Sequence, residues 1–284
     1  METRSIAFLL VLPALALMLF VTVYPIIGVL YYSLYSYNII TGEFRFSGLN
    51  EYIELMRDPI FLISIRNTVV FSIAATGLQT ILGLVIAVLV SQRIRGKRYI
   101  IPILVLPNMF SVVVVSSMWK LMLDYETGLI NYILKFLGFQ PLPWLTSMDL
   151  ALFSIVLIDT WQWTPICFLI FYAGLQSIPR ELYEAAMVDG ASPIRTFTRI
   201  TLPMLKPYIA LVLLLRSIDT FRLFDKVYLL TGGGPANSTE TISLYIFKTG
   251  LVFWDIGKAS AASFIMLALI LTISALYIRR SILS

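Results

Sequence analysis

The sequence predicts an all-α membrane protein with about six transmembrane helices. Of its 284 residues, 59% are hydrophobic and only 13% are charged, and the mean hydropathy is +0.88. A water-soluble domain cannot bury so much apolar surface, whereas helices that face lipid need not bury it. The apolar residues also fall into runs that approach the roughly 20 residues needed to cross a bilayer as a helix. We therefore expect a single transmembrane domain over residues 1–284.

Six apolar runs separated by polar connectors are the predicted spans. The first run is too long for a signal-peptide core and no small-residue cleavage site follows it, so we expect an uncleaved anchor. Residues 38–67 then form a polar connector, with a short surface helix expected near residues 51–56. The predicted spans are residues 6–30, 69–90, 100–121, 151–175, 207–230 and 256–278.

The composition excludes most catalytic chemistry. The chain has one cysteine, Cys167, and no histidine. A lone cysteine has no disulfide partner, and without histidine neither a zinc motif based on histidine nor a Ser–His–Asp triad can form. No Gly-x-x-x-x-Gly-Lys-Ser/Thr sequence is present, so the chain lacks a phosphate-binding loop of its own. We expect no cofactor, no metal site and no nucleic-acid partner, and we expect that the chain is not itself an enzyme.

A polar segment between the fourth and fifth spans, Ser177–Pro203, is predicted to form two short helices. Pro179 suits the first turn of a helix, and Gly190 suits a left-handed helix end. Ser192 is expected to cap the second helix, with Pro193 at its first position. Its apolar face carries Ile194, Phe197 and Ile200, and we expect Leu202-Pro203 to stop the helix. A plain amphipathic connector lying on the membrane surface is the alternative interpretation.

The same segment resembles the EAA loop of ABC importer permeases. The matching pattern is Glu184-Ala185-Ala186, three residues, Gly190, nine residues, Ile200, one residue and Leu202-Pro203. The resemblance implies a type I ABC importer permease fold with a cytoplasmic EAA coupling helix that docks on a separate ATPase subunit. It assigns Glu184 to a salt bridge with an arginine of that subunit. The ATPase-coupling residues implied are Glu184, Ala185, Ala186, Asp189, Gly190, Ile200, Leu202 and Pro203.

Cations give the orientation independently of the resemblance. Lys and Arg are enriched in short cytoplasmic connectors of membrane proteins. With the EAA-like segment inside, eleven cations face the cytoplasm: Arg4, Arg93, Arg95, Lys97, Arg98, Arg180, Arg195, Arg199, Lys206, Arg279 and Arg280. Seven cations are spread over the much longer outer segments. We therefore expect a multi-pass protein of the cell (inner or plasma) membrane with both termini in the cytoplasm.

Polar residues within the spans are the candidates for a transport pathway. Ionisable side chains at membrane depth cost roughly 2.5 to 3.5 kcal/mol each, so they need partners or a wet cavity. Arg216 and Asp219 lie three residues apart and can pair on one helix. Asp159 and Gln162 offer hydrogen bonds to sugar hydroxyls, while Trp163 offers a flat face for a sugar ring. Structural ion pairs and a packing role for the tryptophan are the alternatives.

The whole chain resembles the maltose-, trehalose- and glycerol-phosphate-type carbohydrate permeases. The segments that carry the resemblance are Leu175-Gln176-Ser177-Ile178-Pro179, Phe224-Asp225 and Thr231-Gly232-Gly233-Gly234-Pro235, the last typical of the first of two permease subunits. The resemblance places a sugar site on three of the spans. With the charged and polar neighbours, the pathway candidates are Asn108, Asp159, Gln162, Trp163, Arg216, Asp219 and Thr220.

These observations predict the permease subunit of an ATP-driven, binding-protein-dependent carbohydrate importer, with a di- or oligosaccharide such as trehalose or maltose as substrate. The expected partners are a second permease subunit (a heterodimer), two ATPase subunits, an extracytoplasmic sugar-binding protein and the lipid bilayer. An ion-coupled secondary transporter is the alternative, with Asp159, Arg216 and Asp219 as coupling charges. A polytopic membrane enzyme is a third interpretation, which the absence of histidine and of clustered metal ligands disfavours.

Overall fold

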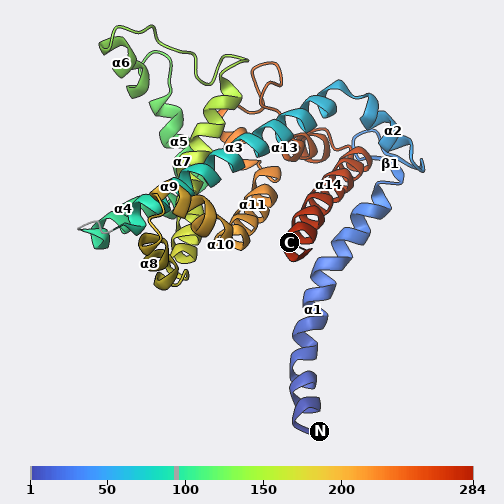
Figure 1. The fold of residues 1–284 in the computed structure, drawn as a ribbon. Coiled ribbons are helices and arrows are strands. Elements are labelled where there is room, and N and C mark those ends of the chain that lie inside the picture. The colour runs from blue at the N-terminus through green and yellow to red at the C-terminus, as the bar shows by residue number, and fades with distance from the viewer. Residues whose placement is uncertain (1, 93–95, 284) are drawn as a thin grey trace. The chain divides into compact units, whose positions relative to one another are not determined.

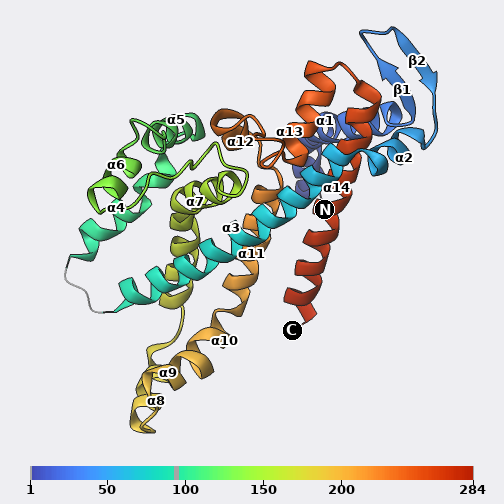
Figure 2. The same cartoon turned by 90° about the horizontal axis from the view of Figure 1, so that it is seen from above.

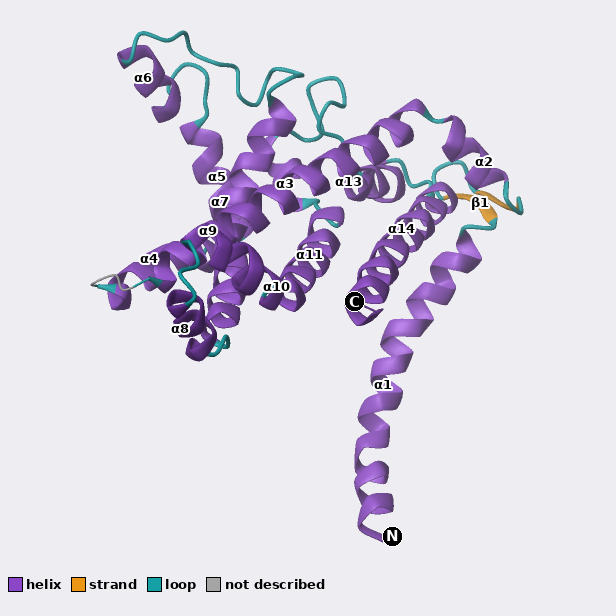
Figure 3. Ribbon diagram, viewed as in Figure 1, coloured by secondary structure: helices purple, strands orange, loops and turns teal. Residues whose placement is uncertain are grey.

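Helices make up most of the chain in the computed structural model, which describes residues 2–92 and 96–283 (Figures 1 and 3). In order, the elements are α1 (Glu2–Tyr32), β1 (Tyr35–Asn38), β2 (Glu43–Phe46), α2 (Asn50–Arg57), α3 (Pro59–Ser91), α4 (Lys97–Met109), α5 (Val112–Met122), α6 (Leu129–Phe136), α7 (Ala151–Gln176), α8 (Arg180–Val188), α9 (Pro193–Thr196), the π-helical turn η1 (Phe197–Thr201), α10 (Leu202–Met204), α11 (Lys206–Phe221), α12 (Asp225–Leu230), α13 (Ile242–Phe247), the π-helical turn η2 (Lys248–Val252) and α14 (Ile256–Leu283). The predicted helical membrane class is confirmed. Arg93 and Arg95, two of the cations used for the orientation, lie outside the described residues.

Within the described residues, four helices are long and apolar enough to cross a membrane. They are Val11–Tyr32, Pro59–Ser91, Ala151–Gln176 and Ile256–Tyr277. The number rises to six if each of two bent helix pairs is counted as one span. The exact limits of the six spans remain a prediction, since length and composition alone do not locate a bilayer.

Contacts divide the chain into two compact units. The first unit comprises Met1–Leu62 with Tyr245–Leu269, and the second comprises Ile63–Leu244 with Ile270–Ser284. The first unit contains α1, whose apolar stretch Val11–Tyr32 buries none of its residues within the chain. An exposed helix of this composition requires lipid or another protein around it.

A small β-hairpin in the first unit was not predicted. β1 and β2 pair antiparallel, with Tyr35 opposite Phe46, and Figure 2 shows the hairpin beside α2. Asn38 also bridges to Asp255, ahead of α14. A Cβ at Gly257 would lie 2.2 Å from the carbonyl oxygen of Tyr35, so only glycine permits this close approach of α14 to β1.

The core of the second unit forms where α3, α4, α7 and α11 pack together. Its buried apolar centre consists of Ala87, Val90, Cys167, Phe168, Phe171 and Val212. A Cβ at Gly83 of α3 would lie only 2.6 Å from the Cβ of Cys167 on α7. Small residues let membrane helices approach in this way, because their association depends on close van der Waals packing.

The second predicted span begins earlier than expected. α3 starts at Pro59, whereas residues up to 67 were expected to be a loop. The Asp58 carboxylate accepts hydrogen bonds from the backbone amides of Ile60 (2.9 Å) and Phe61 (3.3 Å), which satisfies the first turn. Further along, the Asn67 amide donates to the carbonyl oxygens of Asn237 and Glu240, both at 3.0 Å. Asn67, one of the polar residues that suggested a loop, is therefore a buried helix residue with partners, whereas its neighbour Arg66 is exposed.

Two predicted spans are interrupted. Residues 100–121 form two helices, α4 and α5, bent by 93° at Phe110 and Ser111. The Ser111 hydroxyl accepts from the backbone amide of Val114 at 3.3 Å and so caps α5. The fifth span, predicted over residues 207–230, likewise breaks after Phe221, and α12 begins only at Asp225.

Candidate functional site

The segment Ser177–Pro203, here called the coupling segment, folds largely as predicted. α8 ends before Gly190, whose φ of +69° is the left-handed conformation that glycine adopts most easily. Ser192 caps the next helix by accepting from the Arg195 backbone amide at 3.4 Å, and Pro193 occupies the first helical position. The helix runs one residue past the predicted stop at Leu202-Pro203, to Met204, and then bends by 62° into α11.

The coupling segment presents an apolar surface. Met187, Val188 and Ile194 are 70%, 88% and 77% exposed, although side chains of this kind are normally buried. The Tyr183 hydroxyl lies 3.1 Å from the Thr201 hydroxyl and ties the two helices of the segment together. An exposed apolar surface held rigidly in this way is typical of a protein-interaction site.

The EAA-like residues do not all face outwards. Glu184, Ala185 and Asp189 are exposed, whereas Ala186 is only 7% exposed. Ala186 therefore packs within this chain and not against a partner, and its small size allows the two helices of the coupling segment to approach. Glu184 and Ala185 remain available for contact with another protein.

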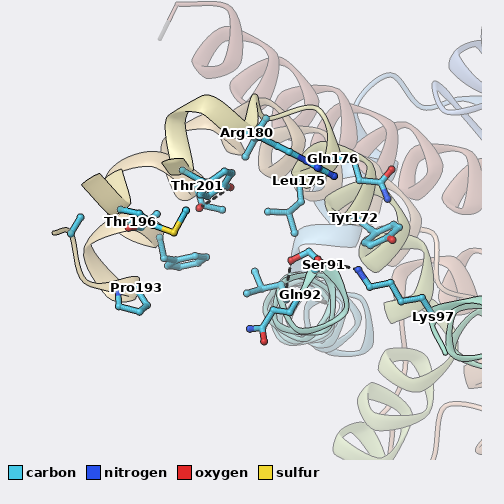
Figure 4. A pocket seen from close by; sticks show the side chains of 16 residues that line it. Ser91, Gln92, Lys97, Tyr172, Leu175, Gln176, Arg180, Pro193, Thr196 and Thr201 are labelled. Atoms are coloured by element: carbon cyan, nitrogen blue, oxygen red, sulfur yellow. Dashed lines mark hydrogen bonds between the residues drawn. The ribbon is translucent and has the colours of Figure 1, made fainter. Parts of the chain in front are cut away.

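A large open cavity lies beside the coupling segment (Figure 4). It has a volume of about 840 Å³ and is lined by the end of α3, the start of α4, the end of α7 and the coupling segment itself. Lys97 of α4 donates from Nζ to the carbonyl oxygen of Ser91 at 3.1 Å across this cavity wall. The coupling segment thus shares a cavity with the ends of α3, α4 and α7.

A cluster of charged side chains lies inside the second unit, and we call Asp159, Arg216, Asp219 and Lys226 the ion cluster. The Asp159 carboxylate is the centre, since Arg216 Nη2 lies 3.3 Å from its Oδ2 and Lys226 Nζ donates to its Oδ1. Arg216 Nη1 lies 3.0 Å from Asp219. Asp159, Arg216 and Lys226 are buried. Buried charges persist only when paired, as these are.

Gln79 of α3 completes the ion cluster. Its Oε1 accepts from Arg216 Nε at 2.7 Å, and its Nε2 donates to Asp159 Oδ2 at 2.8 Å. The Arg216 guanidinium also lies 4.9 Å from the centroid of the Trp163 ring, a cation–π geometry. Side chains from α3, α7, α11 and α12 therefore converge on one polar site in a very apolar protein.

A cavity of about 290 Å³ opens onto the ion cluster and is called here the ion-cluster cavity. Its lining consists of Val112, Asp159, Trp163, Arg216, Asp219, Thr220, Arg222, Leu223, Phe224, Asp225 and Lys226. Both helix interruptions border it, since α5 begins at Val112 and α11 gives way to α12 between Arg222 and Phe224. A ligand in this cavity would meet charged groups and the Trp163 ring together.

Comparison with known proteins identifies the family. The sequence profile of the family described as "Binding-protein-dependent transport system inner membrane component" matches residues 79–280. The chain belongs to this family. It is therefore a permease component of an ABC transport system and an integral membrane protein.

Relatives and solved structures extend over the whole permease. The trehalose/maltose transport system permease protein MalF of Thermococcus litoralis is 38% identical over 275 residues, which cover 97% of this chain and 93% of the relative. The sulfoquinovosyl glycerol transport system permease protein SmoG of Agrobacterium fabrum is 36% identical, and the alignment covers 97% of this chain and 90% of the relative. A crystal structure of a bacterial ABC transporter involved in the import of the acidic polysaccharide alginate matches the fold with a TM-score of 0.87 at 24% identity, covering 99% of this chain and 96% of that one.

The permease brings together most of the predicted pathway residues. Five of the seven line the ion-cluster cavity: Asp159, Trp163, Arg216, Asp219 and Thr220. Asn108 and Gln162 do not line it. The Gln162 amide donates to the Phe110 carbonyl oxygen at 3.1 Å, at the break between α4 and α5. Asn108 has its amide nitrogen buried without a hydrogen-bond partner among the described residues.

Two members of the site were missed. Gln79 and Lys226 belong to the ion cluster or contact it, but neither is among the pathway candidates predicted from the sequence. The signal for Lys226 was a lysine in an apolar stretch, which must find a counter-ion if it is buried. Arg222 and Asp225 share the three-residue spacing of Arg216 and Asp219, but within the described residues no ion pair joins them, since the helix is interrupted between the two positions.

Proposed function

We propose that this permease is one of two transmembrane subunits of an ATP-driven, binding-protein-dependent carbohydrate importer, and that a di- or oligosaccharide such as trehalose or maltose passes through the ion-cluster cavity. The convergence of charged, hydroxyl and aromatic side chains on one cavity carries the proposal. Trp163 offers a ring face to the apolar face of a sugar, and the exposed Asp219 carboxylate offers hydrogen bonds to its hydroxyls, whereas the Thr220 hydroxyl is buried and bonded to Ser72 of α3. The volume of about 290 Å³ is at the lower end of small-molecule sites, about 300 Å³.

The relatives support carbohydrate as the cargo. The MalF relative is named for trehalose and maltose, and its alignment runs almost from end to end of both chains. The SmoG relative is named for sulfoquinovosyl glycerol. We therefore assign a carbohydrate to this importer and take a neutral disaccharide as the first candidate.

The coupling segment is the proposed docking site for a cytoplasmic ATPase subunit. Its exposed apolar side chains would seat in a cleft of that subunit, and the exposed Glu184 carboxylate would pair with an arginine there. ATP-driven closure of two ATPase subunits then moves the coupling segment, and α11, which follows it directly, carries that motion to Arg216 and Asp219. The permease itself hydrolyses no ATP. Gly190 supplies the turn, and Asp189, Ile200, Leu202 and Pro203 hold the segment in shape.

The orientation and the partners follow from this role. The coupling segment lies in the cytoplasm, as do both termini. A second, homologous permease forms a heterodimer with this chain and lines the other half of the pathway, and an extracytoplasmic sugar-binding protein delivers the cargo. Neither the fold nor the relatives support an ion-coupled secondary transporter, which would also leave the exposed surface of the coupling segment without a purpose.

Affinity purification from native membranes tests the docking. Glu184→Lys reverses the charge proposed to meet the ATPase, and a broken interfacial charge pair costs about 2 to 5 kcal/mol, or roughly 30-fold or more in affinity. We expect an ATPase subunit to co-purify with the wild type and to be lost from this variant. Glu181→Lys is the matched control, because Glu181 is also exposed on α8 but stands outside the EAA-like pattern.

Uptake of radiolabelled trehalose into membrane vesicles tests the transport role. We expect uptake to require ATP and the binding protein and to persist when an ionophore collapses the membrane potential. Trp163→Ala should lower uptake while leaving co-purification of the ATPase intact. Uptake that survives ATP depletion but stops with the ionophore would overturn the importer assignment.

A further inference from the structure

We propose that Asp219 makes the ion-cluster cavity selective for neutral over anionic sugars, by holding the position on Arg216 that an anionic group of a substrate would occupy. This inference rests on the proposed carbohydrate import. It concerns the charge of the substrate, which the transport role alone leaves open.

The buried part of the ion cluster carries an excess positive charge. Arg216 and Lys226 are 3% and 1% exposed, and the one buried carboxylate between them, Asp159, is 3% exposed. Two cations against one anion leave a net charge of +1 away from water. An uncompensated buried cation is unfavourable, so this charge requires a further anion at the cavity.

Asp219 supplies that anion from the cavity side. Its Oδ2 lies 3.0 Å from Arg216 Nη1, and its side chain is 55% exposed, in contrast to the buried guanidinium. The guanidinium is otherwise occupied, since Nε donates to Gln79 and Nη2 faces Asp159. A substrate carboxylate or sulfonate that approached Arg216 from the cavity would meet the Asp219 carboxylate already placed on Nη1.

The exposed part of the cavity wall is also acidic. Its exposed charged residues are Asp219, Arg222 and Asp225, which sum to −1. Together with the buried +1, the six charged residues of the lining balance to zero. An anionic sugar at Arg216 would therefore meet the Asp219 carboxylate already placed beside the guanidinium and would gain no net counter-charge from the lining, whereas a neutral sugar finds carboxylate acceptors for its hydroxyls.

The fold itself does not dictate this preference. The alginate transporter with the same fold is described as involved in the import of an acidic polysaccharide, whereas the MalF relative is named for trehalose and maltose, which carry no charge. Charge selection within such proteins must then come from individual side chains. Asp219 is the exposed carboxylate that contacts the buried Arg216 at this cavity.

The electrostatic potential inside the ion-cluster cavity can be measured without any transport assay. Val112 is half-buried and lines the cavity, so Val112→Cys places a thiol there. The native Cys167 is fully buried and serves as the unreactive background. The purified full-length permease is reacted with a cationic (trimethylammonioethyl) and an anionic (sulfonatoethyl) methanethiosulfonate, each rate being divided by the rate for a free thiol.

We expect Asp219→Asn to shift the ratio of the two normalised rates toward the anionic reagent by about threefold or more relative to the wild type, since one unit charge acts oppositely on the two reagents. Asp219→Glu should keep the wild-type ratio. Asp149→Asn is the control, because Asp149 is exposed but does not line this cavity. An unchanged ratio in Asp219→Asn would overturn the proposal.

A second experiment tests whether a bound sugar slows labelling of the introduced thiol, which relates the electrostatic potential of the cavity to the choice of substrate. Trehalose at millimolar concentration should slow labelling of the thiol introduced by Val112→Cys when Asp219 is intact, while a uronic-acid disaccharide should protect that thiol only when Asp219→Asn is also present. Protection by the uronate with Asp219 intact would also refute charge selection. If neither Val112→Cys nor a second reporter, Phe224→Cys, reacts with either reagent, the cavity is closed to water and the proposal fails. Because the labelling ratio involves neither ATP nor a partner, it can fail while trehalose uptake succeeds, and the reverse.

Discussion

Removal of the Asp159 carboxylate should destabilise the permease more than removal of Lys226, one of the two cations that it binds. Asp159→Asn leaves Lys226 buried without its counter-ion and weakens one of the contacts of Arg216. Breaking a buried ion pair from one side costs about 3 to 5 kcal/mol, because the stranded charge remains. Lys226→Met instead leaves Asp159 with donors from Gln79 and Arg216. The loss is then that of one charged hydrogen bond, about 1.5 to 3 kcal/mol.

The double variant distinguishes a coupled cluster from two independent residues. Once Lys226 is replaced by methionine, Asp159→Asn no longer strands an ammonium. The double variant should therefore be destabilised by about 1.5 kcal/mol or more less than the sum of the two single variants. Thermal unfolding of the purified permease is the assay. At about 2 to 4 °C per kcal/mol, Asp159→Asn should lower the Tm by at least about 6 °C. Additive shifts, or a Lys226→Met shift larger than that of Asp159→Asn, would show that the ion cluster does not act as described.

Two further predictions concern packing and pH. Gly83→Val should lower stability by about 1 to 3 kcal/mol in the same thermal assay, since its Cβ would lie 2.6 Å from the Cβ on the facing α7 helix, whereas Gly77→Ala meets nothing within 4 Å and should be neutral or better. At Asp58, burial favours a higher pKa, but hydrogen bonds from the Lys258 ammonium and the Tyr245 hydroxyl outweigh it and hold the pKa below its usual value. A lowered carboxylate pKa stabilises the fold above about pH 4, and this contribution is lost as the pH falls through the folded value. Acid unfolding followed by circular dichroism should therefore start at a higher pH in Lys258→Met.

The coupling segment could be predicted closely because its determinants are local. The glycine at position 190 and the Ser192-Pro193 pair act on the backbone within one turn, and the structure confirms their conformations. The spacing of Arg216 and Asp219 likewise predicted an ion pair that the structure contains. The stop predicted at Leu202-Pro203 falls one residue later, at Met204, because the proline stands at the second position of a helical turn and is tolerated there.

The position of Lys226 could not be predicted, since it depends on a break in the helix. On one continuous helix, ten residues after Arg216 would place Lys226 about 80° away from it around the axis, at 3.6 residues per turn. In the structure the helix ends at Phe221 and α12 starts at Asp225, and this redirects the ammonium onto Asp159. A pattern read along a uniform helix has no information about such a break.

The two breaks and the ion cluster have a common physical basis. Irregular backbone inside a membrane protein is tolerated only where it is covered by protein or lines a cavity, because its freed amides and carbonyls need partners. The break at Phe110 meets this requirement through the Gln162 amide, which donates to the Phe110 carbonyl oxygen. The break after Phe221 lies on the wall of the ion-cluster cavity itself. The interruptions that limit prediction from sequence are therefore also what allows a charged cavity to exist among apolar helices.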